Sequence, residues 1–244
     1  RWGASSVIVV GIAGVVAVLV AMLSMGRGFQ TTMNSTGDET TAIVLRGGSQ
    51  AETNSVIMRD QIPLISSLPG VARDAEGKPI VSPELSQVVN LVSRADGTDV
   101  NAQFRGVGEQ GWAMHEKVKI IEGRKFGTGL REIVVGQGAQ KQFRDLDVGS
   151  TLTLGNQQWQ VVGKFASGDV HDSEIWTDAQ TLATTYNRGA YQSVLVRTGK
   201  DGYESFKAAV EADPQLQLDV LTTRSYFAKQ SGGLKSLLQI LGTV

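Results

Sequence analysis

The polar loop near residues 168–174 gathers the residue types that could do chemistry. Asp169, His171, Asp172 and Glu174 all fall between positions 169 and 174. Carboxylate and imidazole groups are metal ligands, so this spacing is compatible with a metal site. The other interpretation is a solvated polar loop, because clustered charged residues most often face water. We favour the solvated loop and assign no metal ligand to it.

The remaining candidate groups form no catalytic constellation. His115 stands alone, and the sequence has only 2 histidines. Ser49 follows two glycines at the end of a predicted strand and lacks the context of a nucleophile elbow. The sequence has no cysteine, which excludes a disulfide, a thiol nucleophile and a zinc–thiolate site. We therefore predict no catalytic, metal-binding or cofactor-binding residues, and a protein that is not an enzyme.

Two glycine-rich segments resemble nucleotide-binding motifs only in part. Gly136-Gln137-Gly138 follows a predicted strand and opens a predicted helix, but Lys141 stands where a dinucleotide fingerprint needs its third glycine. The segment is more typical of a tight strand-to-helix turn. Gly199-Lys200 is followed by Asp201, so there is no P-loop. The formal net charge of −1, with both signs interspersed, also argues against nucleic-acid binding.

The strongest signal in the chain is its first apolar stretch, Val7 to Met25, because the whole run from Trp2 to Gly26 is uncharged. Helical residues rise by about 1.5 Å each, so the stretch spans about 28 Å, close to the hydrocarbon thickness of a bilayer. A signal peptide has a shorter apolar core, and a buried helix of a soluble protein has more polar interruptions. We predict a transmembrane helix over residues 1–27, in contact with the lipid bilayer.

The rest of the chain alternates short strand and helix patterns. Asp96-Gly97 and Gly155-Asn156 each predict a hairpin turn between alternating segments, and Asp178 is a predicted N-cap for a helix over 179–186. Residues 29–36 should extend the first helix into water. Apolar residues near 3.6 spacing predict a helix over 54–68, which Pro63 would break or kink.

This order of elements predicts an α+β fold with two lobes. Residues 40–81 and 191–221 both read strand–helix–strand, and they flank a middle rich in strands. We expect a split βαβ lobe made of residues 28–85 and 175–232, with a β-rich lobe, residues 86–174, inserted between its halves.

The last residues, 233–244, carry apolar side chains at helical spacing with only Lys235 charged. The segment is too short to span a membrane. It is either an ordinary amphipathic C-terminal helix or the start of a second transmembrane helix. We favour the second interpretation, because a helix with so little polar surface needs cover.

Taken together, several short motifs resemble the periplasmic core domain of ABC transporter permeases in the MacB/FtsX superfamily. Each motif is weak alone, but their order and spacing are specific. They are the small-residue helix at 7–25, Leu68-Pro69-Gly70-Val71, Arg105-Gly106-Val107, Glu122-Gly123-Arg124-Lys125-Phe126, EIVVGQGAQ at 132–140 and GSTLTLGNQQWQVVG at 149–163.

The resemblance implies a non-catalytic permease fragment in the inner (cytoplasmic) membrane, with its main domain periplasmic. The split lobe would be the porter-like lobe and the inserted one the Sabre-like lobe. The implied partners are a cytoplasmic ABC ATPase subunit, a second permease copy in a homodimer or heterodimer, and a periplasmic adaptor protein. ATP hydrolysis would move the extracytoplasmic domains for substrate export or release.

Two other functional classes compete with this interpretation. The main alternative is a membrane-anchored extracytoplasmic sensor or ligand-binding domain, which also needs one helix before a mixed α/β domain. An anchored extracytoplasmic enzyme is the third, and the lack of an acid/base or nucleophile cluster argues against it.

Overall fold

The computed structural model of the chain describes the backbone of residues 2–199 and 201–242, and the side chains of 9–28, 30–33, 35–199 and 201–232. The predicted start of a second transmembrane helix, residues 233–244, therefore lies outside the described side chains. Its backbone is helical as far as Gly242, the end of α7 (Thr223–Gly242).

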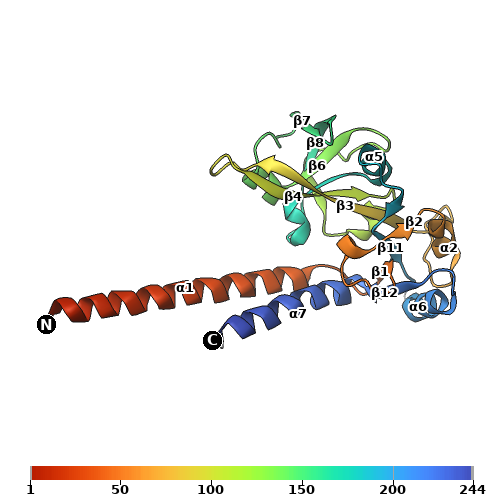
Figure 1. Ribbon diagram of the computed structural model, residues 1–244. Coiled ribbons are helices and arrows are strands. Elements are labelled where there is room, and N and C mark those ends of the chain that lie inside the picture. Colours follow the sequence, from red (N-terminus) through yellow and green to blue (C-terminus); the bar gives the residue numbers. More distant parts are fainter. Residues whose placement is uncertain (1, 200, 243–244) are drawn as a thin grey trace.

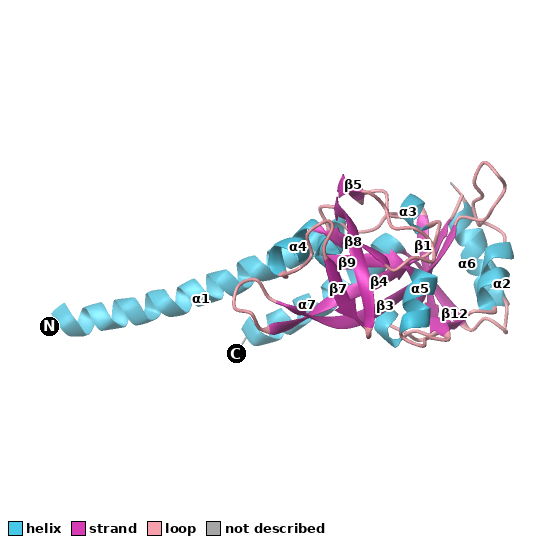
Figure 2. Cartoon of the chain, turned by 90° about the horizontal axis from the view of Figure 1, so that it is seen from above, coloured by secondary structure: helices cyan, strands magenta, loops and turns pink. Residues whose placement is uncertain are grey.

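Two long helices leave the domain side by side. α1 (Trp2–Ser35) contains a segment, Val9–Met33, that is long and apolar enough to cross a membrane, and none of this segment is buried. α7 lies next to the part of α1 nearest the domain (Figures 1 and 2). The helix therefore continues unbroken past the predicted anchor, as expected for residues 29–36. We call residues 28–35 of α1 and the first three turns of α7 the stalks.

Four strands form the predicted split βαβ arrangement. β1 (Thr41–Arg46) lies between β11 (Ser193–Arg197) and β12 (Leu218–Thr222) and is antiparallel to both. β11 and β12 are thus parallel, and α6 (Gly202–Ala212) connects them. β11 in turn lies between β1 and β3 (Val81–Val92). The chain segment that leads from β1 to β3 contains α2 (Gln61–Ser67). We call β12, β1 and β11, with η1 (Glu52–Asn54), α2 and α6, the split section.

The sheet continues from β3 into a second group of strands. Residues 81–84 of β3 pair with β11, and residues 85–92 pair with β4 (Asp99–Val107). Among the described residues the order is then β4, β9, β6, β8 and β5, with β7 on β8. We call these strands, with α3, α4, α5 and η2, the inserted section. Their bounds are β5 (Lys119–Gly123), β6 (Glu132–Gly136), β7 (Thr151–Leu154), β8 (Gln157–Ala166), β9 (Glu174–Asp178), α3 (Gly111–Met114), α4 (Gln137–Gln142), α5 (Ala179–Thr185) and η2 (Val170–Ser173).

The predicted turns are confirmed where local chemistry specified them. Gly97 has φ +74° in the turn between β3 and β4. Gly155 and Asn156 both have positive φ, 58° and 59°, between β7 and β8, as a type I′ hairpin requires. Gly136 ends β6 and α4 follows at once, so the glycine pair at 136–138 is a strand-to-helix turn.

The helix predicted over 54–68 is wrong in its first half. Residues 52–54 form the 3₁₀ turn η1 (Glu52–Asn54), and β2 (Ile57–Met58) pairs with β10 (Ala190–Tyr191). The helix α2 begins only at Gln61. Pro63 then lies in the first turn, where its missing N–H breaks no helical hydrogen bond. Pairing with a distant strand outweighed the helical spacing.

Alternate residues of β1 face two different cores. Ala42 and Val44 pack with Phe206 of α6 and the other residues of one core. Ile43 and Leu45 face the opposite side, where they pack with Met114 and with Tyr226 of α7. The sheet thus carries α6 on one face and the start of the α7 stalk on the other, because β1 is apolar on both faces.

Replacing the confirmed N-cap Asp178 by alanine should lower the free energy of unfolding by about 1 kcal/mol. Its Oδ2 accepts hydrogen bonds from the Thr181 backbone N at 2.9 Å and from the Thr181 hydroxyl at 2.7 Å. Urea unfolding of D178A measures this loss. Asp178→Asn keeps a capping oxygen and should cost less than D178A, and equal losses would contradict the capping role.

Candidate lobe and stalk junction

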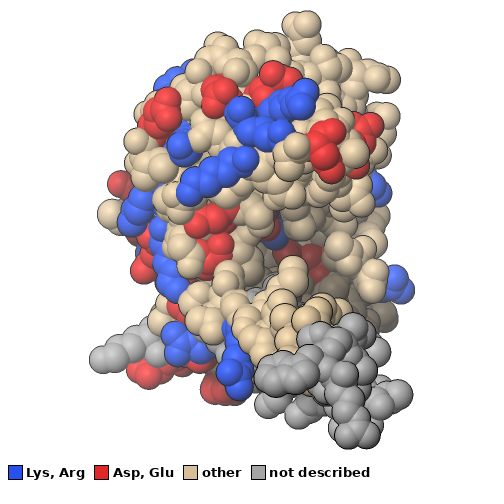
Figure 3. All heavy atoms as spheres, turned by 90° about the vertical axis from the view of Figure 1, so that its left-hand side faces the viewer, with Lys and Arg blue, Asp and Glu red and all other residues tan. Residues whose placement is uncertain are grey.

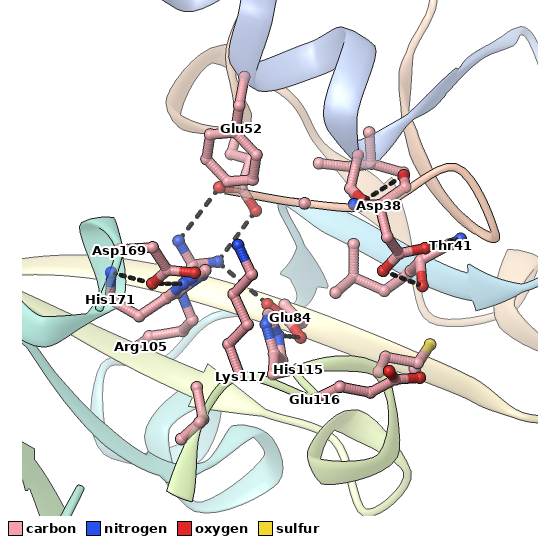
Figure 4. Close-up of a pocket in the computed structure, with 17 residues that line it drawn as sticks. Asp38, Thr41, Glu52, Glu84, Arg105, His115, Glu116, Lys117, Asp169 and His171 are labelled. Carbon is pink, nitrogen blue, oxygen red and sulfur yellow. Dashed lines mark hydrogen bonds and ion pairs between the residues drawn. The ribbon is translucent and has the colours of Figure 1, made fainter. Parts of the chain in front are cut away.

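A cavity of about 110 Å³ lies where the inserted section, β1 and the start of α7 meet (Figure 4). Its walls hold charged groups from both sections and from the segment after α1. The polar residues labelled in Figure 4 are Asp38, Thr41, Glu52, Glu84, Arg105, His115, Glu116, Lys117, Asp169 and His171. No side-chain nitrogen or oxygen buried within the described residues lacks a hydrogen-bond partner. The polar side chains around the cavity therefore form a network in which every buried nitrogen and oxygen described has a hydrogen-bond partner.

Arg105 is the centre of this network, with a side chain that is 5% exposed. Nε and Nη2 donate to the carboxylate of Glu174 at 2.9 and 3.1 Å. Nη1 and Nη2 donate to the carboxylate of Glu52 at 3.1 and 3.2 Å, and Nη1 also donates to Glu84 at 3.0 Å. A guanidinium has five N–H donors in a fixed fork, so these contacts satisfy all of them.

The sheet register brings these groups together from four elements. Arg105 on β4 pairs with Ser86 on β3 and with Trp176 on β9. Glu84 and Glu174 each lie two positions before those partners, and alternate residues of a strand share one face, so both lie on the face of Arg105. Glu52 comes from η1 in the split section. The Arg105 cluster, by which we mean Arg105 with Glu52, Glu84 and Glu174, therefore joins the two sections.

The positive groups of the network lower the pKa values of the glutamates. Burial alone would raise the pKa of Glu84, but His115 and Arg105 outweigh it and bring the pKa to about 2. Burial would also raise the pKa of Glu174, but Arg105 and His171 outweigh burial and lower that pKa. Both carboxyls are thus ionised at neutral pH. The pKa of Arg105 lies well above its ordinary value, because its carboxylate partners outweigh burial.

Both histidines of the chain lie in this cavity. The Nε2 of His115 contacts Glu84 Oε1 at 2.9 Å, and the Nδ1 of His171 contacts Asp169 Oδ1 at 2.8 Å. The two imidazole centroids are 4.9 Å apart, with an angle of 70° between the rings. The ring of Trp176 contacts both, with centroid distances of 4.8 and 5.5 Å.

The start of the α7 stalk rests directly on these groups. The hydroxyl of Tyr226 accepts a hydrogen bond from the Glu52 backbone N at 3.2 Å. The ring of Phe227 lies 6.1 Å from that of His171, edge to face. Any displacement of the first turn of α7 therefore disturbs the contacts of Glu52 and His171.

The two stalks are joined where they enter the domain. The Asp38 backbone N donates to the Thr223 hydroxyl at 2.9 Å, and that hydroxyl donates to the Asp38 carbonyl at 3.0 Å. The Arg224 N also donates to the Asp38 carbonyl. Gly37, with φ +79°, lies so close that a Cβ there would be 2.6 Å from the Thr223 carbonyl carbon. We call Gly37, Asp38, Thr223 and Arg224 the stalk junction.

A wider groove of about 770 Å³ runs between the stalks and the inserted section. Thr32 and Met33 of α1 and Tyr226, Phe227 and Gln230 of α7 form its stalk side. Viewed along the stalks, the molecule is hollowed between them and the domain, with charged atoms visible in the hollow (Figure 3). Arg105, Glu52 and Asp169 line this groove as well as the smaller cavity. The charged network thus separates the two spaces.

The solvated loop predicted around residues 168–174 is wrong. Asp169, His171 and Glu174 are 7%, 4% and 5% exposed, because the loop packs against α4, β6 and β8 and His171 lies beside Phe227 of α7. Asp172 is half-buried and caps the turn at Ser167 and Gly168. These four residues bind different partners, and no group of three or more potential ligands among the described residues could hold a metal ion.

His115 was also predicted to stand alone, which is wrong, since it contacts Glu84 and His171. Arg105, Glu52 and Glu84 are site residues that the sequence did not predict. Asn101, Gln103 and Arg105 alternate with apolar residues, a pattern typical of a solvent face. In the structure the side chain of Arg105 is instead 5% exposed. The one signal available in the sequence was the place of Arg105 in the motif Arg105-Gly106-Val107.

Comparison with known proteins gives a consistent result. The family model described as MacB-like periplasmic core domain matches residues 5–213. The periplasmic region of MacB from Actinobacillus actinomycetemcomitans is similar in structure, with a TM-score of 0.58 and 15% identity, over 78% of this chain and 91% of that one. None of the curated proteins searched by sequence matched.

Two further solved structures share the fold. The extracellular domain of the noncanonic ABC-type transporter YknZ from Gram-positive bacteria has a TM-score of 0.54 and 20% identity, over 75% of this chain and 100% of that one. A domain of a putative permease protein from Porphyromonas gingivalis has a TM-score of 0.50 and 15% identity, over 75% of this chain and 88% of that one. At these identities the likeness concerns the fold.

Proposed function

The chain belongs to the family of MacB-like periplasmic core domains, and on this premise we propose that it couples ATP hydrolysis in the cytoplasm to movement of the extracytoplasmic domain. The family is that of ABC transporter permeases, whose components are in general non-catalytic. The movement would export or release a substrate outside the membrane. The observation that carries the proposal is the continuous path from α1 through the stalk junction and α7 to the Arg105 cluster.

This path has the rigidity that mechanical coupling needs. Two antiparallel helices joined by three hydrogen bonds at one end transmit force better than either helix alone, since neither can slide without breaking those bonds. Tyr226 and Phe227 then carry a displacement of α7 into the buried charges. Because packed interfaces are bistable rather than continuously deformable, a small shift there can select between two arrangements.

We further propose that the two sections act as lobes. One would comprise residues 28–85 and 175–232, and the other residues 86–174. Glu52 lies in the first, Arg105 in the second, and Glu174 at the boundary, so their ion pairs hold the lobes together. Relative movement of the lobes would have to rearrange these pairs.

The proposed assembly has four partners besides the substrate. A cytoplasmic ABC ATPase subunit supplies the energy, and a second permease copy, identical or related, completes the pathway. A periplasmic adaptor protein contacts the domain. The lipid bilayer surrounds the predicted anchor in α1, which ends at residue 27, before the stalk. An apolar helix before a domain of this family indicates a membrane-anchored protein with an extracytoplasmic domain, and we assign it to the inner membrane.

Distance measurement between two copies tests this proposal. The full-length permease, with Leu130 replaced by a spin-labelled cysteine, is reconstituted in nanodiscs with its ATPase. Leu130 is 52% exposed, and this chain has no cysteine of its own. We expect the label-to-label distance to differ between the nucleotide-free and the ATP–vanadate-trapped states.

An ATPase variant that cannot bind ATP is the control and should show one distance under both conditions. A distance unaffected by trapping in the active complex would contradict mechanical coupling. A permease that purifies without any ATPase would favour the membrane-anchored sensor instead.

A further inference from the structure

The two histidines form a close pair in a network that is short of positive charge. Arg105 faces four carboxylates, Glu52, Glu84, Glu174 and Asp169, directly or through an imidazole. With both imidazoles neutral, three negative charges are uncompensated, whereas two imidazolium ions leave only one. Burying uncompensated charge is costly, so the network favours a protonated His171.

Charged and titratable groups face the pair from every element around it. Besides the four carboxylates and Arg105, the cavity wall carries Glu116 and Lys117 after α3 and Asp38 after α1. Glu116 is engaged by Arg197 at 2.8 Å, and the Lys117 ammonium donates to the Ser35 carbonyl of α1. From α7 the only titratable group at the network among the described side chains is Tyr226, whose pKa burial raises to about 12.

We propose that His171, packed against His115, forms a pH-sensitive latch, which holds the first turn of α7 against the inserted section when His171 is protonated and releases it as the external pH rises. The contacts that make the latch are the paired imidazoles, the Trp176 ring beside both, and Phe227 edge to face on His171. A cation beside an aromatic ring is attracted to it, so protonation of His171 strengthens its contacts with the rings of Trp176 and Phe227. The inference does not rest on the proposed function, since it concerns this chain without an ATPase.

The direction of the pH effect follows from the partners of His171. Burial would lower its pKa, but Glu174 and Asp169 outweigh burial and raise the pKa above the ordinary histidine value. Its stabilisation is therefore complete below about pH 6.5 and is lost as the pH rises through the folded-state value. Glu84, with a pKa of about 2, and Tyr226 do not titrate in this window. The external side of a bacterial membrane follows the pH of the surroundings, so the latch would be exposed to such changes.

Nuclear magnetic resonance can observe the protonation of His171 directly. The chain has only 2 histidines, so imidazole-labelled protein in nanodiscs, freed of any purification tag, gives two ring signals. His115→Gln and His171→Gln assign them. We expect the His171 signal to titrate with a midpoint above that of a free histidine. A midpoint at or below the free value would overturn the proposal.

The latch itself is tested by the distance between α7 and the inserted section. Spin labels are attached to Lys229→Cys on α7 and Lys141→Cys on α4, both exposed positions. We expect a single distance at pH 6, whose population falls to less than about half by pH 9 as a second distance grows. The doubly labelled chain, whose cavity residues are all wild type, gives this result.

The double variant H115Q/H171Q is the specificity control. Glutamine keeps a hydrogen-bonding side chain but cannot be charged, so this variant should show the pH 9 distribution at both pH values. A distribution in the wild type that is the same at pH 6 and pH 9 would overturn the latch. So would a pH response that survives in a double variant with wild-type circular dichroism.

Discussion

Replacing Arg105 by methionine is expected to lower the free energy of unfolding by about 3–5 kcal/mol at pH 7. Methionine fills similar volume, so the loss comes from charge. Glu52, Glu84 and Glu174 would keep their burial and lose the guanidinium that satisfies them. Removing one partner of a buried ion pair costs far more than the pair contributes, because the other charges stay desolvated. Urea unfolding of the full chain in detergent micelles, followed by the fluorescence of buried Trp159 and Trp176, measures the loss.

Arg94 provides a matched control for this experiment. It also makes an ion pair, with Asp147 at 3.3 Å, but the two side chains are 41% and 66% exposed. Water replaces the lost partner there, so R94M should cost less than about 1 kcal/mol. If R105M and R94M cost the same, the Arg105 cluster is not a desolvated network.

The cost of R105M should also depend on pH. In the wild type the lowered pKa values of Glu84 and Glu174 mean that their contribution is present above the unfolded carboxyl value, about 4.3, and is lost below it. Without the guanidinium, the pKa of Glu174 loses the largest effect that opposes burial and rises, so the folded variant gains stability as this carboxyl takes up a proton. The difference between variant and wild type should therefore shrink from pH 7 to pH 5.

The features that the sequence predicted correctly are those decided within a few residues. The turn at Asp96-Gly97, the I′ turn at Gly155-Asn156 and the Asp178 cap need only local backbone chemistry. The split βαβ arrangement was also accessible, since the order of strand and helix patterns limits the connections that a sheet allows. The strand β2 was missed because its partner, β10, lies far along the chain.

The Arg105 cluster could not be predicted in the same way. Arg105 is separated by 53 positions from Glu52 and by 69 from Glu174. Along its own strand Arg105 alternates with apolar residues, which is the pattern of a solvent face. The groups that enclose its guanidinium come from η1, β3 and β9, and the sequence near position 105 gives no sign of them. A buried polar network is a tertiary property, whereas periodicity reports only which side of one element is polar.

Replacing Gly37 by alanine is expected to destabilise the chain by about 2–4 kcal/mol and to separate the two stalks. The backbone of Gly37 is in the left-handed region, and an added Cβ would meet the Thr223 carbonyl carbon at 2.6 Å and the Arg224 N at 2.7 Å. Backbone atoms cannot rotate away as a side chain can, so α7 must move. Spin labels at exposed Thr31 of α1 and Lys229 of α7 should then show a longer and broader distance.

Gly48 separates the effect of this contact from backbone strain. It has nearly the same φ, +78° against +79°, but an added Cβ would meet nothing within 4 Å. G48A therefore carries the conformational cost alone, about 1 kcal/mol, and should leave the distance between the stalks unchanged. Equal effects of G37A and G48A would mean that the stalk junction does not hold α1 to α7. In the complete transporter, a G37A variant that still hydrolyses ATP but no longer moves the label at position 130 would place the transmission of force at this junction.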